Sequence, residues 1–248
     1  MNEEQIFRKV VFLDTMTLHY IRLCLEYAKK YNLEFPTDEQ TVSILKNHFG
    51  NVSEEPLRES LLKGLETINL LSRNDVQIEY ASVSKIEILT GITEGEARIK
   101  MAQEGIPHRI WSKFPDREIR DRIASEDLAA IKDRIDDLDS MLEESGVTVT
   151  RSDSNRTNEV IELAKGIVGL IYMGEIDSII YASAVAAGAD YLVTADSYLR
   201  ETVNNIRDSK DQRYEEIRRK LNELTGEFPL PQAFRVTQAG KGVPSSFP

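Results

Sequence analysis

The sequence predicts an α/β fold in which helices alternate with the strands of a parallel sheet. Three short runs of apolar and β-branched residues are typical of buried strands: Lys9–Leu13, Val76–Ala81 and Tyr191–Thr194. The first two runs lead into segments with helical spacing of apolar residues. This alternation of strand and helix along the chain favours a parallel sheet with helical crossovers.

The first part of the chain contains four predicted helices. They are Thr17–Tyr31, Asp38–Phe49, Pro56–Leu71 and a helix that begins after Ser82. Gly50 ends the second helix, because glycine adopts the left-handed cap conformation easily. Pro56 suits the first turn of the third helix. Ser82 is a typical N-cap for the fourth, which carries Glu87.

Residues from about 93 to 145 are predicted to form an insertion: a charged, aromatic loop followed by a helical hairpin. Its apolar residues recur at helical spacing, at Leu128, Ile131, Ile135, Leu138 and Leu142. Such a stripe packs either on the main domain or against a second copy of the chain or another protein. Periodicity alone leaves both interpretations open.

The last part of the chain continues the α/β pattern. Its predicted elements are a strand at Val147–Thr150 and helices at Asn158–Tyr172, Glu175–Ala187 and Arg207–Leu224. Gly188 ends the second of these helices. An extension covers residues from about 226 to 248, within which Ala233–Val236 is either an edge strand or a segment that wraps the surface. We expect one domain over residues 1–248.

Composition excludes several classes of protein. The 248 residues carry 31 Lys and Arg against 42 Asp and Glu, and the net charge of -11 argues against nucleic-acid binding through bulk charge. One cysteine, Cys24, excludes a disulfide framework and a Cys-based zinc cluster. The acidic start M-N-E-E-Q and the shortness of the apolar stretches predict a cytoplasmic protein without a membrane anchor.

Four carboxylates are predicted to meet at one edge of the sheet. Asp14 ends the first strand and Asp196 follows the strand at Tyr191–Thr194, and the carboxyl ends of parallel strands form the ligand crevice in open α/β sheets. Glu87 and Asp177 lie in the first turns of helices that are predicted to start at that edge. Each acid also has an ordinary interpretation: a helix cap, a partner of the helix dipole, an exposed helix residue or a turn former.

The chemistry of such a group indicates a metal site. Like charges at close range oppose one another's ionisation, and a hard divalent cation such as Mg²⁺ or Mn²⁺ removes this conflict because it takes oxygen ligands. A bound ion of this kind polarises a phosphodiester and activates a water molecule. The sequence contains no P-loop, nucleophilic Ser or Cys constellation or CxxC motif that would favour another chemistry.

These motifs resemble those of the PIN-domain nucleases. The matching segments are V-V-F-L-D-T ending at Thr15, A-S-V-S-K-I-E ending at Glu87, I-D-S-I-I-Y-A-S-A around Asp177 and G-A-D-Y-L-V-T-A-D ending at Asp196. The resemblance covers about half of the chain and implies a three-layer α/β/α core with a central parallel sheet. It implies that four acids bind Mg²⁺ or Mn²⁺ and catalyse cleavage of single-stranded or structured RNA: Asp14, Glu87, Asp177 and Asp196. Thr194 would orient a carboxylate or a water.

Basic and aromatic residues that alternate in one loop are candidate RNA contacts. Arg109 and Lys113 flank Trp111, so cations could contact phosphates while the indole stacks on an unpaired base. The alternative is that the aromatic residues anchor the loop to the core. Arg200, one turn after Asp196, is a further candidate. A third basic cluster is Arg218, Arg219 and Lys220, which is otherwise a solvated helix face.

Other functional interpretations follow from departures from the family pattern. Met16 stands where PIN domains often have Asn or Ser, and together with the insertion and the acidic charge it favours a non-catalytic PIN-like module that binds RNA or protein. A phosphatase of the haloacid dehalogenase type needs an acid at that position, and Met16 cannot transfer a proton. The insertion and the C-terminal extension exceed the compact toxins of the family, so an antitoxin is not the favoured partner.

Overall fold

The structure, a computed structural model, describes residues 9–33, 39–73, 76–114, 118, 121, 123, 125–145, 148–149, 157–171, 173–226 and 229–235. The chain divides into two compact units, one formed by Met1–Ser84 with Met141–Pro248 and the other by Lys85–Ser140. Several predicted element ends lie outside the described residues: Asp38, Val147, Thr150, Tyr172 and Val236. No helix in the described part of the chain is long and apolar enough to span a bilayer.

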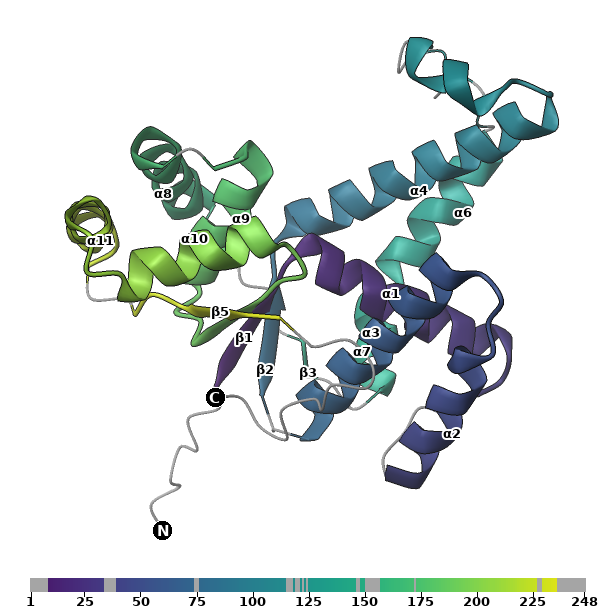
Figure 1. The fold of residues 1–248 in the computed structure, drawn as a ribbon, viewed down its shortest axis with the longest axis horizontal. Helices are drawn as coiled ribbons and strands as arrows, with labels where there is room; N and C mark the ends of the chain where they lie inside the picture. The colour runs from purple at the N-terminus through teal and green to yellow at the C-terminus, as the bar shows by residue number, and fades with distance from the viewer. Residues whose placement is uncertain are drawn as a thin grey trace. The chain divides into compact units, whose positions relative to one another are not determined.

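A parallel five-stranded sheet forms the centre of the larger unit (Figure 1). Its strands are β1 Val10–Leu13, β2 Gln77–Tyr80, β3 Thr148–Val149, β4 Tyr191–Val193 and β5 Gln232–Phe234. Each neighbouring pair in the order β3-β2-β1-β4-β5 is parallel. The predicted α/β class with a parallel sheet is therefore confirmed.

The direction of strand addition reverses at β1. From β1 the chain adds β2 and then β3 on one side, and it later returns to add β4 and β5 on the other. Leu13 pairs in register with Val193, so Asp14 and Thr194 follow neighbouring strands at the same edge. In open parallel sheets, the place where the strand order reverses is where ligands bind.

Apolar residues on both faces explain why the strands have continuous apolar sequences. Phe12 and Leu192 join a cluster formed with four helices: α8 Thr157–Leu170, α9 Glu175–Ala186, α10 Ser197–Asp208 and α11 Gln212–Thr225. Val11 and Leu13 alternate with Phe12 and are also fully buried. Figure 1 shows the helices α1 Thr15–Lys30 and α3 Glu55–Arg73 on the other side of the strands from α9 and α10.

Helix α3 packs against both α1 and the helix α2, Glu39–Gly50. The backbones of α1 and α3 approach closely at Gly64, because a Cβ placed there would lie 2.2 Å from the carbonyl oxygen of Tyr20. Two residues after Tyr20 on α1, the buried Arg22 forms an ion pair of 2.6 Å with Glu26. The close approach of α1 and α3 is thus made at Gly64, and the ion pair lies within α1.

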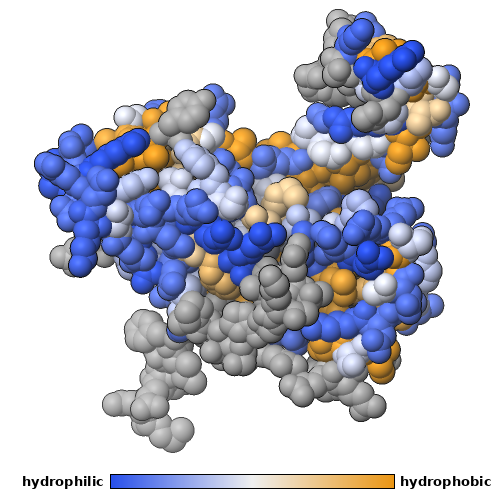
Figure 2. Space-filling view, viewed as in Figure 1, coloured by the Kyte–Doolittle hydropathy of each residue, from blue (hydrophilic) through white to orange (hydrophobic). Residues whose placement is uncertain are grey.

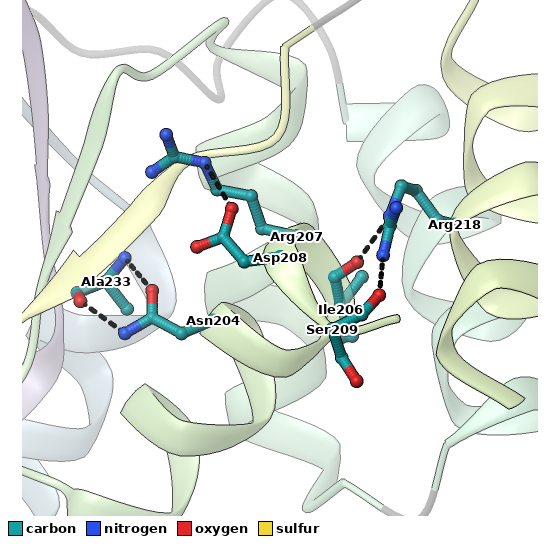
Figure 3. Close-up of polar contacts among 7 residues, drawn as sticks. All are labelled: Asn204, Ile206, Arg207, Asp208, Ser209, Arg218 and Ala233. Atoms are coloured by element: carbon teal, nitrogen blue, oxygen red, sulfur yellow. Dashed lines mark hydrogen bonds and ion pairs between the residues drawn. The ribbon is translucent and has the colours of Figure 1, made fainter. Parts of the chain in front are cut away.

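The helix predicted at Arg207–Leu224 corresponds to α11, but its predicted start is wrong, because α11 begins at Gln212 and Arg207 belongs to a separate helix, α10, that was not predicted. Asp211 begins α11 by accepting a backbone N–H of its first turn. Arg218 of α11 donates to the carbonyl oxygens of Ile206 at 2.8 Å and Ser209 at 2.6 Å (Figure 3). The guanidinium thereby holds the C-terminal end of α10, which is why the chain turns here.

Strand β5 lies within the predicted C-terminal extension, so the edge-strand alternative holds for this segment. Its outer side is occupied by Asn204 of α10 (Figure 3). The Asn204 amide donates to the carbonyl oxygen of Ala233 at 2.8 Å and its oxygen accepts the Ala233 N–H at 2.9 Å. The rest of the extension beyond Arg235 lies outside the described residues.

The smaller unit is helical. It contains most of α4, Ser82–Gln103, then the short 3₁₀ helix η1 His108–Lys113, α6 Ser125–Asp136 and the start of α7 Leu138–Glu144. Lys100 of α4 pairs with Asp127 of α6 at 2.6 Å, and Lys85 pairs with Asp139 of α7 at 3.0 Å. The loop predicted from about residue 93 is therefore wrong over its first part, because α4 continues to Gln103, and the two helices predicted after the loop correspond to α6 and α7.

The predicted apolar stripe of the insertion is mostly buried. Ile131, Ile135, Leu138 and Leu142 are buried, whereas Leu128 is 40% exposed.

The surface of the larger unit differs between its helices. Hydrophobic surface lies on α8, where Ile161 and Val168 are exposed, and hydrophilic surface covers α11 (Figure 2). Isolated exposed apolar residues of this kind are normal on protein surfaces.

Candidate functional site

Asp14 stands at the carboxyl end of β1 with only 3% of its surface exposed. Its Oδ1 caps α1 by accepting the backbone N–H of Thr17 at 2.6 Å. Its Oδ2 accepts the hydroxyl of Thr194 and, at 3.3 Å, the N–H of Ala195. The helix-cap interpretation therefore holds for Asp14, and the same carboxylate joins the ends of β1 and β4.

Thr194 connects Asp14 to the second aspartate of the edge. It is 1% exposed, and while its hydroxyl donates to Asp14 it also accepts the backbone N–H of Asp196 at 3.0 Å. Asp196 is exposed and caps α10 by accepting the N–H of Leu199 at 3.0 Å. Two capping aspartates thus follow neighbouring strands, with the Thr194 hydroxyl between them.

Burial raises the pKa of Asp14 above its ordinary value, and the hydrogen bonds from Thr17, Thr194 and Ala195 oppose this shift without cancelling it. The cause is desolvation, which penalises the charged carboxylate. A cation placed beside Asp14 would stabilise its ionised form.

Replacing Asp14 with Asn should change how stability depends on pH. Because the folded-state pKa of Asp14 is raised, wild type loses this residue's contribution as the pH rises from about 3.8 through the folded value. Asn does not titrate, so the difference in unfolding free energy, wild type minus Asp14→Asn, should fall across this window and then level off. Urea unfolding of both proteins between about pH 4 and pH 8 measures this difference. A difference that rises with pH would contradict the expectation.

The other two predicted acids lie on helices. Asp177 is half-buried in the first turn of α9, and its Oδ2 lies 3.1 Å from where a Cβ at Gly174 would stand. Gly174 therefore leaves room for this carboxylate. Glu87 is half-buried on α4, within the smaller unit. The convergence of Glu87 and Asp177 with Asp14 stays a prediction.

The oxygen donors at this edge match the chemistry of a hard divalent cation. Among the described residues, no three or more His, Cys, Asp and Glu side chains are grouped as a metal site requires. Mg²⁺ and Mn²⁺ nevertheless accept one or two carboxylates and complete their shell with water. Asp14 and Asp196 supply such carboxylates, and burial raises the pKa of Asp14.

The predicted RNA contacts divide into exposed and half-buried groups. Arg109 and Lys113 are exposed on η1, whereas Trp111 is half-buried and its indole N–H donates to the carbonyl oxygen of Ile106 at 3.0 Å. This bond lies within the loop itself, so anchoring of Trp111 to the core stays a prediction. Arg200 is half-buried on α10.

The third basic cluster has structural partners. Arg218 is bound to the end of α10, as described above, and Lys220 forms an ion pair of 2.9 Å with Glu216 on its own helix. Arg219 pairs with Glu223 in the same way. The interpretation as a solvated helix face therefore fits this cluster better than RNA binding does.

Two large apolar side chains are exposed beside the aspartates. Met16 is 45% exposed and Tyr198 is 54% exposed, and each stands two residues after a capping aspartate, in the first turns of α1 and α10. The edge between β1 and β4 therefore combines buried polar groups with exposed apolar surface.

Sequence reasoning missed a small cleft next to Asp14. It lies between α1, α3 and the ends of β4 and β5, and its lining includes Thr17, Tyr20, Lys63, Thr194, Ala195 and Arg235. Helical periodicity predicts that α3 has a buried face, but it does not predict which element that face meets. No signal in the sequence predicts that Lys63 and Arg235 line the same cleft.

Comparisons of the chain with protein-family models, with curated proteins and with solved structures find no match. The functional interpretation therefore depends on the geometry of this edge and on the motifs that resemble PIN domains.

Proposed function

We propose that this protein is a metal-dependent nuclease with a PIN-like, three-layer α/β/α core that hydrolyses phosphodiester bonds of single-stranded or structured RNA. One observation carries the proposal: Asp14, Thr194 and Asp196 are joined by hydrogen bonds at the edge where the strand order reverses. Open parallel sheets bind their ligands at this position. Carboxylates there suit a metal ion that acts on a phosphodiester.

Each residue has a separate role in the proposed site. Asp14 and Asp196 hold the ion, and Glu87 and Asp177 are the further proposed ligands. Thr194 fixes the orientation of the Asp14 carboxylate through its hydroxyl. When bound, Mg²⁺ or Mn²⁺ supplies Lewis-acid activation of water and of the phosphodiester.

Exposed apolar side chains support unpaired RNA as the substrate. Met16 and Tyr198 present surface beside the carboxylates, and aromatic rings stack on bases that are not already stacked in a duplex. A single strand offers such bases, as do loops of a structured RNA.

A non-catalytic binding module is the second candidate, and one observation favours it. Both oxygens of Asp14 already accept hydrogen bonds from the protein, as does one oxygen of Asp196. These bonds suffice to explain why aspartates stand at the two helix N-termini. Metal-dependent turnover separates the two candidates.

The experiment is cleavage of an end-labelled single-stranded RNA with Mn²⁺, Mg²⁺ or EDTA. We expect wild type to cut with the metals and not with EDTA, and Asp14→Asn and Asp196→Asn to cut at least about 100-fold more slowly, since metal stabilisation of the transition state amounts to several kcal/mol. Asp211→Asn is the matched control, because Asp211 also caps a helix but lies outside the edge. It should cut like wild type.

The control decides between a capping role and a catalytic one. If Asp14→Asn and Asp196→Asn cut RNA as fast as Asp211→Asn and wild type, the carboxylates only cap helices and the site assignment is wrong. If wild type neither cuts RNA nor binds Mn²⁺ in calorimetry, the binding module replaces the nuclease.

A further inference from the structure

The cleft next to Asp14 is lined by residues that contact the buried carboxylate. It is shallow, with an internal volume of about 10 Å³, which is room for about one water molecule. Thr17, Thr194 and Ala195 line it, and these are the three residues that donate hydrogen bonds to Asp14. A group bound at the mouth of the cleft would therefore be separated from the Asp14 carboxylate by these residues.

Two cations from distant parts of the chain line the same cleft. Lys63 comes from α3, and Arg235 directly follows β5. The Lys63 side chain is 17% exposed, with its Nζ 3.6 Å from an oxygen of Glu59 and 5.0 Å from the centre of the Tyr20 ring. The first contact is longer than a hydrogen bond, so the ammonium keeps donor capacity.

Arg235 adds a second source of donors. It is exposed, and among the described residues no hydrogen bond or ion pair joins its guanidinium to another side chain. The hydroxyls in the cleft are already committed as donors, Thr17 to the carbonyl oxygen of Val193 and Thr194 to Asp14. Positive charge in the cleft therefore comes from Lys63 and Arg235, in a protein whose net charge is -11.

We propose that the mouth of this cleft binds a phosphate group, with Lys63 and Arg235 as its charged contacts, and that the phosphate belongs to the backbone of the RNA strand. An oxyanion suits the site because the available groups are cationic donors, and a guanidinium and an ammonium are the side chains that bind phosphate best. The choice of RNA as the source rests on the proposed function. The bound phosphate would hold the strand next to the Asp14 edge.

The test measures binding without cleavage. A fluorescein-labelled single-stranded RNA is titrated in EDTA, and its anisotropy is followed at several salt concentrations for wild type, Lys63→Gln and Arg235→Gln. We expect each variant to bind about tenfold more weakly, and the slope of log K against log salt to fall by about 0.7 for each lost phosphate contact.

Three variants act as controls. Lys165→Gln on α8 and Arg213→Gln on α11 remove the same charge from other helices, and they should leave both affinity and slope near the wild-type values. Lys63→Arg keeps the charge and should retain most of the affinity. It also separates a lost contact from a folding defect, which thermal melting of every variant would reveal.

Inorganic phosphate alone identifies the source of the ligand. One outcome is that wild type broadens the ³¹P signal, Lys63→Gln does not, and both cleft variants bind RNA like wild type. This outcome supports the phosphate site and assigns it to a small molecule. Weaker RNA binding by both cleft variants supports the backbone phosphate. If neither ligand responds to Lys63 and Arg235, the proposal is overturned.

The outcomes for the two proposals are separate. Wild type that never cuts RNA, yet binds phosphate through Lys63, would reject the nuclease and keep the phosphate site. Wild type that cuts RNA in a metal-dependent way, with cleft variants that bind both RNA and inorganic phosphate like wild type, would keep the nuclease and reject the phosphate site.

Discussion

Gly64→Ala is expected to destabilise the protein by about 3 kcal/mol, because overpacking at a rigid contact forces the surrounding backbone to move. The added Cβ would lie 2.2 Å from the carbonyl oxygen of Tyr20 and 2.7 Å from the Cβ of Cys24. The atoms it meets belong to the backbone and first side-chain carbon of α1, which cannot rotate away. Helices α1 and α3 would have to separate, exposing apolar residues that both now bury.

The same substitution at Gly91 is the matched control. Gly91 lies inside α4, and a Cβ there meets nothing within 4 Å. Gly91→Ala should therefore stabilise the protein by up to about 1 kcal/mol, through helix propensity alone. Urea unfolding of both variants measures the two effects. Equal effects of the same sign at the two positions would contradict the close approach at Gly64.

Glu26→Ala is expected to cost about 3 kcal/mol of stability, because it removes the carboxylate that forms an ion pair with a buried guanidinium. Arg22 has a side chain that is 2% exposed, and its Nη1 lies 2.6 Å from Oε1 of Glu26, which is 20% exposed. The partial exposure of Glu26 places the effect at the low end of the range for buried pairs.

Replacing both members of this pair provides the control. Arg22→Met with Glu26→Leu removes both charges and keeps apolar volume, so the double variant should lie within about 1 kcal/mol of wild type. Denaturant unfolding compares it with the Glu26→Ala variant. A double variant as unstable as the single one would show that the guanidinium contributes through other contacts.

The sequence predicted the sheet well because its strands are buried on both faces. Val10–Leu13 and Tyr191–Val193 are almost wholly apolar, and such runs stand out from the amphipathic helices around them. Helix α10, Ser197–Asp208, and the start of α11 at Gln212 were missed although signals were present. Leu199, Val203 and Ile206 have helical spacing, and Asp211 is a good N-cap.

The candidate site was predictable only in part. Asp14 and Asp196 follow recognisable strands, so their place at one edge could be expected from topology. Lys63 could not be expected there, because its position depends on how α3 packs on α1, and this is a matter of side-chain shape rather than periodicity. The resemblance implied that Thr194 orients a carboxylate or a water, and its hydroxyl does donate to a carboxylate, that of Asp14, across the register between β1 and β4.

Asn204 occupies the outer edge of the sheet at β5. The backbone groups of Gln232 and Phe234 bond to the β4 side, while Ala233 directs its N–H and carbonyl outward, where the Asn204 amide takes both. An unprotected edge strand is a template for joining another chain, and proteins block such edges to avoid aggregation. Here the Asn204 amide makes the two hydrogen bonds to Ala233 that a neighbouring strand would make. An incoming strand would have to displace both bonds before it could pair with β5.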